Sequence, residues 1–309
     1  MPDSADSRSG GEALQNHSTD YLLLLLLAFI WSASFLLIKI GVASIEPVTL
    51  TAARMVIAAV VLGLYLAIRK TGIPLNGRAL LLYAVVGFVG NTLPFILISW
   101  GETHIDSSLA AIMMGIMPIT TFVLAHYFIP DEPMTLRKVL GICLGFSGLL
   151  TLVGWSALAG VGGANILGQL SVLVAAISYG VTTVFVRTQP AFPGLQMAAG
   201  AVFAGMISSI PLAFVLEDPL AMRPTLESMW ALLLLGIFPT ALAALLYFRL
   251  VRNLGATTFA QLNYVIPIFG SLWGVILLGE LLQMRMLTAL GLVLTGIYFI
   301  RPRAAARPG

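Results

Sequence analysis

Two segments of this chain match each other at a fixed spacing of 148 residues. Each segment contains five apolar runs of membrane-spanning length, and a chain that crosses a membrane five times ends on the side opposite its start. The second segment is therefore expected to lie upside down relative to the first. The matched positions are Trp31 with Tyr179, Lys39 with Arg187, Glu132 with Glu280, Arg137 with Arg285 and Gly148 with Gly296, and Pro118 pairs with Pro267 at a spacing of 149.

Ten apolar runs predict an all-α integral membrane protein with ten transmembrane helices in two inverted five-helix repeats. About 20 helical residues cross a hydrocarbon core of about 30 Å, and 59% of the 309 residues are hydrophobic whereas 9% are charged. A membrane β-barrel would instead show short strands of alternating polarity. The runs are 21–41, 47–68, 79–101, 107–128, 136–155, 167–187, 194–216, 228–250, 256–278 and 284–300.

The repeats divide the chain into three parts. Residues 1–20 are rich in Ser, Asp and Gly, and we expect them to form a disordered cytoplasmic tail. The first repeat covers residues 21–158 and the second covers 165–301, with a glycine-rich linker between them. Cys143 is the only cysteine, which excludes an internal disulfide.

The positions of Lys and Arg predict the orientation in the membrane. With the N-terminus inside, 12 of the 16 basic residues fall in inner loops and tails, as is typical of membrane proteins. We therefore expect a multi-pass protein of the plasma membrane, which in a bacterium is the inner membrane, with both termini cytoplasmic. This bias also explains the pI near 9.2 without any binding of nucleic acid.

Prolines beside small polar residues mark the expected middle of four spans. A proline frees the carbonyl four residues earlier, and freed backbone at membrane depth is tolerated where it faces protein or a water-filled cavity. The pattern predicts helix breaks that line a path and take part in gating. The prolines are Pro94, Pro118, Pro239 and Pro267, with Asn91, Thr92 and Thr240 beside two of them.

One basic residue, Arg54, lies deep inside a predicted span. It is seven residues into the second run, about 10 Å along the helix axis, and charges at such depth are functional hypotheses by default. Arg54 either contributes to a translocation cavity or gate, or bonds helix-end carbonyls. Five acids cluster near the outer face and are interpreted as solvated loop ends, with an external vestibule as the alternative: Glu102, Asp106, Glu217, Asp218 and Glu280.

The fourth and ninth spans differ at matched positions, where one carries methionines and the other carries amides. This combination predicts a cavity for a small amphipathic solute such as an amino acid, although core packing alone also explains the methionines. The predicted solute-binding residues are Trp31, Ser34, Arg54, Asn91, Thr92, Met113, Met114, Tyr179, Gln261, Asn263 and Tyr264.

Two further patterns favour structural roles. Glu132 and Glu280 each precede a helix start, where a carboxylate is stabilising. Glycines on the fifth and tenth spans allow close approach of helices, within one chain or between two copies in a homo-oligomer. Three scattered histidines do not form a metal site, and we expect no cofactor, no metal and no enzymatic activity. The glycines are Gly141, Gly145, Gly148, Gly291 and Gly296.

These residues together resemble the ten-helix EamA-type members of the drug/metabolite transporter superfamily, over Tyr21 to Ile300. The resemblance implies a permease, usually an exporter of amino acids or related metabolites, with a cavity formed by helices 1–4 and 6–9. It implies no particular substrate. A membrane scaffold or receptor is the alternative, but it would not need inverted repeats with paired prolines. The supporting segments are 28–39, 47–54, 108–118 and the Glu-x4-Arg motifs at Glu132 and Glu280.

Overall fold

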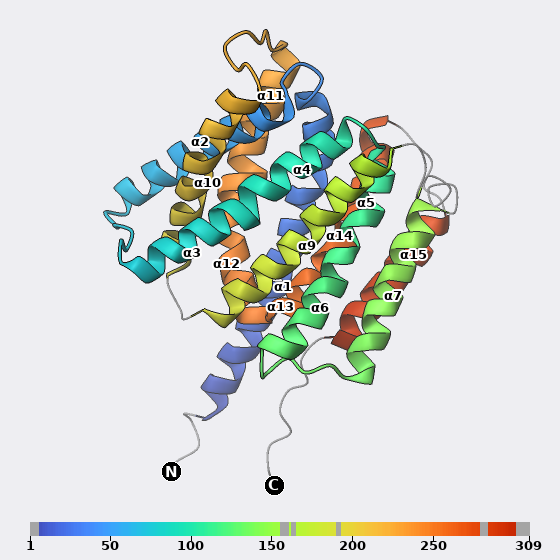
Figure 1. Cartoon of the computed structure of the whole chain (residues 1–309). Helices are drawn as coiled ribbons and strands as arrows, with labels where there is room; N and C mark the ends of the chain where they lie inside the picture. Colours follow the sequence, from blue (N-terminus) through green and yellow to red (C-terminus); the bar gives the residue numbers. More distant parts are fainter. Residues whose placement is uncertain (1–5, 155–160, 162–164, 190–192, 279–283, 301–309) are drawn as a thin grey trace.

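The computed structural model describes residues 6–154, 161, 165–189, 193–278 and 284–300, and within them every regular element is helical (Figure 1). Eight helical segments are long and apolar enough to cross a membrane. Two further apolar helices, α14 and α15, are each 17 residues long. The described residues confirm the prediction of an all-helical protein with several apolar helices of membrane-spanning length.

The two halves of the chain contain matching series of helices. The first half comprises α1 (Asp6–Gly41), α2 (Pro47–Ile68), α3 (Gly77–Gly87), η1 (Phe88–Thr92), α4 (Leu93–Glu102), α5 (Ser107–Met114), α6 (Ile116–Phe128) and α7 (Leu136–Val153). The second comprises α9 (Ile166–Thr188), α10 (Gly194–Leu216), α11 (Leu226–Leu235), η2 (Gly236–Leu242), α12 (Ala243–Leu254), α13 (Ala256–Ala260), α14 (Leu262–Leu278) and α15 (Met284–Ile300).

The first helix starts earlier than the sequence indicates, because α1 is helical from Asp6 within the predicted disordered tail. Extending an existing helix fixes one residue for each hydrogen bond gained, whereas starting a new helix is costly. The apolar span provides the nucleus for this extension. At the end of the expected tail, Asp20 is buried, and its carboxylate accepts hydrogen bonds from Arg249 Nε and Asn253 Nδ2 of α12, each at 2.8 Å.

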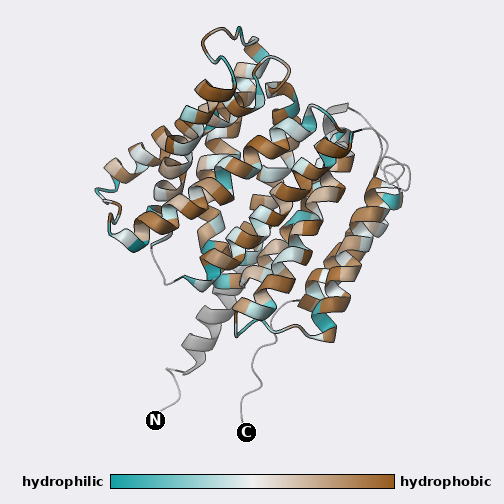
Figure 2. Cartoon of the chain, in the orientation of Figure 1, coloured by the Kyte–Doolittle hydropathy of each residue, from teal (hydrophilic) through white to brown (hydrophobic). Residues whose placement is uncertain are grey.

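Hydrophobic residues predominate along the helices (Figure 2), and many large apolar side chains are exposed. Leu64 is 61% exposed, Ile207 is 67% exposed and Ile68 is 77% exposed. A protein dissolved in water rarely exposes so many large apolar side chains together. Lipid is the solvent that these surfaces fit, and the chain is a multi-pass membrane protein.

The third span of each half contains a π-helical segment, η1 or η2. Pro94 follows η1 as the second residue of α4, and Pro239 lies inside η2. Thr92 and Thr240, which are 148 residues apart, occupy equivalent positions in the two segments. The next spans are also interrupted, at Gly115 between α5 and α6 and at Gln261 between α13 and α14.

The second helix of each half packs against the interrupted span of the other half. Helix α2 contacts η2, α10 contacts η1, and α2 and α10 also pack against each other. Helices α4 and α6 pack against α9, and α1 packs against α11, α12 and α14 (Figure 1). This reciprocal packing places both interrupted spans beside the middle of the bundle.

Helices α7 and α15 form a separate pair at one side of the bundle (Figure 1). A Cβ atom added to Gly141 would lie 2.7 Å from the Gly296 carbonyl oxygen, and one added to Gly148 would lie 3.0 Å from that of Ala289. These three predicted glycines therefore serve the contact between α7 and α15 within the chain. Gly291 has nothing within 4 Å of such a Cβ, and assembly through this pair of helices stays a prediction.

Candidate solute cavity

Two adjoining cavities lie at the centre of the bundle, with empty volumes of about 510 and 590 Å³. Because they share lining residues, we describe them as two lobes of one central cavity. Asn91, Thr182, Val202 and Thr240 line only the first, the threonine lobe; Ser34, Arg54, Met114 and Asn263 line only the second, the arginine lobe. The residues that line both are Trp31, Phe95, Tyr179, Pro239 and Tyr247.

The lobes are built from matched positions of the two halves. Ser34 in the arginine lobe corresponds to Thr182 in the threonine lobe, and Arg54 corresponds to Val202, each at a spacing of 148 residues. Trp31 and Tyr179, which correspond in the same way, line both lobes. The centre of the bundle is thus nearly symmetric in position, although its charge is confined to one lobe.

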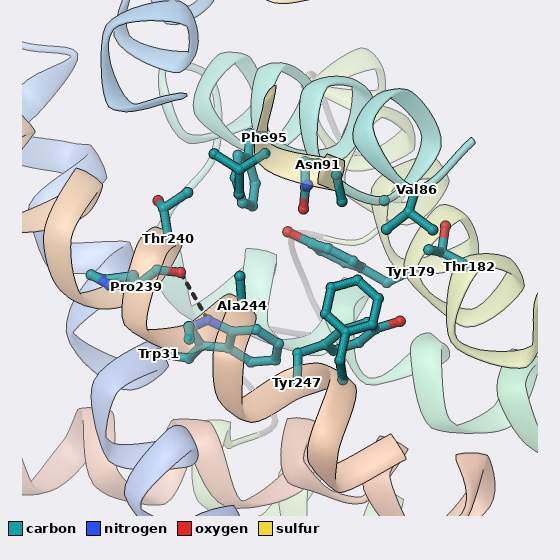
Figure 3. Close-up of a pocket in the computed structure, with 15 residues that line it drawn as sticks. Trp31, Val86, Asn91, Phe95, Tyr179, Thr182, Pro239, Thr240, Ala244 and Tyr247 are labelled. Atoms are coloured by element: carbon teal, nitrogen blue, oxygen red, sulfur yellow. Dashed lines mark hydrogen bonds between the residues drawn. The ribbon is translucent and has the colours of Figure 1, made fainter. Parts of the chain in front are cut away.

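Four aromatic residues line both lobes, and Figure 3 shows Trp31, Phe95, Tyr179 and Tyr247 around the threonine lobe. Trp31 Nε1 donates a hydrogen bond of 3.1 Å to the Pro239 carbonyl oxygen in η2. Tyr247 donates to Thr183 Oγ1 at 3.3 Å. These bonds hold large rings in fixed positions at membrane depth, where an unpaired polar group is costly.

Arg54 is 2% exposed and is held by contacts that depend on the proline in η2. Pro239 has no N–H for the Leu235 carbonyl, and Thr240 Oγ1 donates to this oxygen at 2.7 Å. The same hydroxyl accepts a hydrogen bond of 3.0 Å from Arg54 Nε. Pro239 and Thr240, in the second half of the chain, thereby position Arg54 of the first half.

The guanidinium of Arg54 also lies over an aromatic face, with Cζ 3.9 Å from the centroid of Phe95. Arginine stays protonated in proteins and binds planar partners through its fork of N–H groups. Within the described part of the chain, the ion pairs are Arg187 with Glu132 and Arg249 with Asp20. Arg54 therefore has no carboxylate partner among the described residues.

The structure brings some of the predicted binding residues together and leaves others away from the cavity. Thr92, for example, turns toward α10, where its hydroxyl bonds the Gly205 carbonyl at 3.0 Å. Lining residues among those predicted are Trp31, Ser34, Arg54, Asn91, Met114, Tyr179, Pro239 and Asn263. Thr92, Met113, Gln261, Tyr264, Pro94, Pro118 and Pro267 line neither lobe, and their roles in binding or gating stay predictions.

Close packing explains the position of two residues that lie outside the lobes. Tyr264 is fully buried, and its ring occupies the space beside Gly145, where an added Cβ would lie 2.4 Å from Tyr264 Cδ2. Gln261 is fully buried at the break between α13 and α14, with no hydrogen-bond partner for its amide among the described residues. Sequence reasoning missed Phe95, Tyr247 and Thr182 as lining residues.

Glu132 lies at the end of the bundle at which α1 begins and contacts the other half of the chain there. Its carboxylate accepts hydrogen bonds from the backbone nitrogens of Ala256 and Thr257, each at 2.8 Å. It also lies 3.6 Å from Arg187 Nε. The sequence predicts that Glu132 serves the helix that follows it, which is wrong: it stabilises the start of α13 in the other half, and the Thr135 hydroxyl caps α7 instead.

A glycine makes this contact possible. Gly255 has φ of +84°, a conformation that residues with a Cβ avoid, and an added Cβ would lie 2.7 Å from Glu132 Oε1. Arg187 extends the contact, since its Nη1 donates to the Arg252 carbonyl oxygen at 2.8 Å, near the end of α12. A cation at the C-terminal carbonyls of a helix is stabilising.

The opposite end of the bundle repeats part of this arrangement. Lys39, the counterpart of Arg187, donates to the Glu102 carbonyl oxygen at 2.8 Å at the end of α4. The Glu102 side chain is fully buried, and neither carboxylate oxygen has a hydrogen-bond partner among the described residues. The interpretation of Glu102 as a solvated loop end is therefore wrong, because α9 packs over the end of α4. Glu280, the counterpart of Glu132, lies outside the described residues.

Asp106 and Asp218 are exposed, as the sequence predicts. Glu217 instead bonds the backbone nitrogens of Val48 and Thr49, at 2.9 and 2.7 Å, at the start of α2. A carboxylate is stabilised there by the unpaired N–H groups and the dipole of the helix. The four described acids near outer span ends thus occupy three environments: exposed for Asp106 and Asp218, bonded to the start of α2 for Glu217, and buried for Glu102.

Several known proteins match this chain over most of its length. The chain is 31% identical to an S-adenosylmethionine/S-adenosylhomocysteine transporter of Chlamydia trachomatis over 90% of this chain and 88% of the relative. It is 25% identical to a "Probable terminal-alkyne amino-acid exporter" of Streptantibioticus cattleyicolor over 92% and 94%. One solved crystal structure superposes with a TM-score of 0.76 at 19% identity, covering 91% of this chain and 97% of that chain, a likeness of fold alone.

The profile of the EamA-like transporter family matches twice, once in each half of the chain. The matches cover residues 19–154 and 166–301. They agree with the two series of helices and with the spacing between matched residues. The chain belongs to the EamA-like transporter family.

Proposed function

We propose that this protein is a secondary transporter of the plasma membrane that exports amino acids or related metabolites by alternating access. The observation that carries the proposal is the central cavity, which is lined by matched residues of both halves beside two interrupted helices. Irregular backbone at membrane depth is typical of transporter binding sites. A cavity between two similar halves can open to either side when one half rocks against the other.

Ten transmembrane helices in two inverted repeats are part of this proposal. The span within α1 (Thr19–Gly41) and the helix α9 support it: Asp20 at the start of that span bonds Arg249, whereas Arg187 near the end of α9 bonds the Arg252 carbonyl, on the same turn of α12. These contacts favour opposite directions for α1 and α9, as an inverted repeat requires. The bias of basic residues supports cytoplasmic termini.

The chemistry of the cavity and the relatives support an amino acid or a related metabolite as the solute. The lobes combine a guanidinium, amides and hydroxyls with aromatic and aliphatic walls, which suits a molecule with a polar and an apolar part. One relative is named for export of an amino acid and another for transport of S-adenosylmethionine, which has an amino-acid end.

The test is counterflow of radiolabelled amino acids and S-adenosylmethionine in proteoliposomes that contain the purified full chain. We expect uptake of at least one compound by the wild type, and its loss in Trp31→Ala, which removes a ring that lines both lobes. Trp230→Ala is the matched control, because Trp230 is 58% exposed near a span end. If no compound of the panel is exchanged by correctly folded protein, a scaffold or receptor role replaces transport.

A further inference from the structure

We propose that Arg54 binds a carboxylate group of the transported solute, so that the protein accepts solutes that carry a carboxylate and rejects cations that lack one. This inference rests on the proposed transport function and deepens it by assigning the recognised group. Its basis is a buried cation that lines the arginine lobe and has no acidic partner among the described residues.

The contacts of Arg54 leave one side of its guanidinium available. Nε is engaged by Thr240 Oγ1 at 3.0 Å, and the ring of Phe95 covers one face at 3.9 Å. The terminal Nη1 and Nη2 groups form no hydrogen bond with other described residues. Because Arg54 lines the lobe, these groups are the ones that a solute can reach. Two parallel N–H groups match the two oxygens of a carboxylate.

The surroundings make an anionic partner favourable. No acidic side chain lines either lobe among the described residues, Ile98 and Ile266 supply apolar walls of the arginine lobe, and Phe95 lies against the guanidinium. A buried charge without a partner is costly, and a carboxylate that enters the lobe neutralises it. A cation without a carboxylate would instead meet a like charge in a medium of low dielectric constant, where repulsion is strong.

The geometry also distinguishes this role from a purely structural one. A structural arginine would need only the bond between Nε and Thr240, which joins α2 to η2. Removing such a bond would weaken the binding of all solutes by a common factor. Removing a carboxylate anchor would weaken the binding of carboxylates while leaving neutral analogues almost unchanged.

The experiment compares 4-methylpentanoate with 4-methylpentanamide, which have the same shape but differ in charge. Binding to purified full-length protein in detergent is measured by calorimetry, for the wild type, Arg54→Gln and Arg54→Lys. The matched control is Arg69→Gln, an exposed residue at the end of the same helix. We expect the wild type and Arg69→Gln to bind the carboxylate at least about tenfold more tightly than the amide.

Arg54→Gln should lower the ratio of carboxylate affinity to amide affinity to near one, while changing the affinity for the amide less than about threefold. Arg54→Lys should keep part of this ratio, because lysine retains the charge but not the planar fork of N–H groups. An unchanged ratio in Arg54→Gln overturns the proposal. If Arg54→Gln does not fold, the wild type decides, since equal affinity for the two probes also overturns it. Binding is measured without flux, so a failure of transport in proteoliposomes refutes the proposed function and not the anchor.

Discussion

Replacing Glu132 by Gln should weaken the folded state by about 3 kcal/mol. The carboxylate makes two bonds of 2.8 Å to the backbone at the start of α13, and hydrogen bonds to charged groups each contribute about 1.5–3 kcal/mol. Gln keeps one acceptor oxygen but turns an NH2 group toward the second N–H. The lost attraction to Arg187 adds at most about 1 kcal/mol, because that side chain is 29% exposed and screened by solvent.

The assay is thermal unfolding of purified protein in detergent, followed by tryptophan fluorescence. One kcal/mol shifts the Tm of a domain of 150–250 residues by about 2–4 °C, so we expect Glu132→Gln to lower Tm by roughly 6–12 °C. The control is Asp131→Asn, an exposed acid one residue away, which should leave Tm within about 1 °C. A Tm for Glu132→Gln equal to that of the control would refute the contribution of this contact.

Three further outcomes follow from particular contacts. Gly141→Ala should lower Tm by several degrees, because its Cβ would lie 2.7 Å from a carbonyl oxygen of α15. The control Gly291→Ala meets nothing within 4 Å and should leave Tm unchanged. Equal effects of the two substitutions would contradict this packing. Trp31→Phe removes the bond to the Pro239 carbonyl, worth about 1 kcal/mol, and should slow counterflow roughly fivefold at matched expression; an unchanged rate would show that the bond is dispensable. A cysteine at Val161, in a protein otherwise free of cysteine, should react with impermeant reagents from outside the cell, and labelling only from inside would contradict the proposed topology.

Features that depend on local backbone chemistry could be predicted from the sequence. The expectation that a proline frees a carbonyl is met at Pro239, where Thr240 bonds the freed Leu235 oxygen. The depth of Arg54 followed directly from its place in an apolar run. Both arguments use only neighbouring residues in the chain, and neither requires knowledge of how the helices pack.

Features that depend on which helix face meets which neighbour could not be predicted in the same way. Thr92 and Thr240 occupy matched positions, yet Thr92 bonds the backbone of α10 and Thr240 bonds Arg54. Apolar helices in lipid have no polar face that marks their orientation, so Phe95 and Tyr247 gave no sign that they line the cavity. The partner of Glu132 also lies more than a hundred residues away in the chain.

The pairing of Arg54 with Val202 bears on how such a protein could have evolved. Two identical halves would each carry the arginine, and two unpaired guanidiniums would then face one central space and repel each other. Once the halves are encoded in one chain, each can mutate independently. Loss of the second charge then gives the cavity a positive and a neutral lobe, so that an asymmetric solute has one preferred orientation between two similar halves.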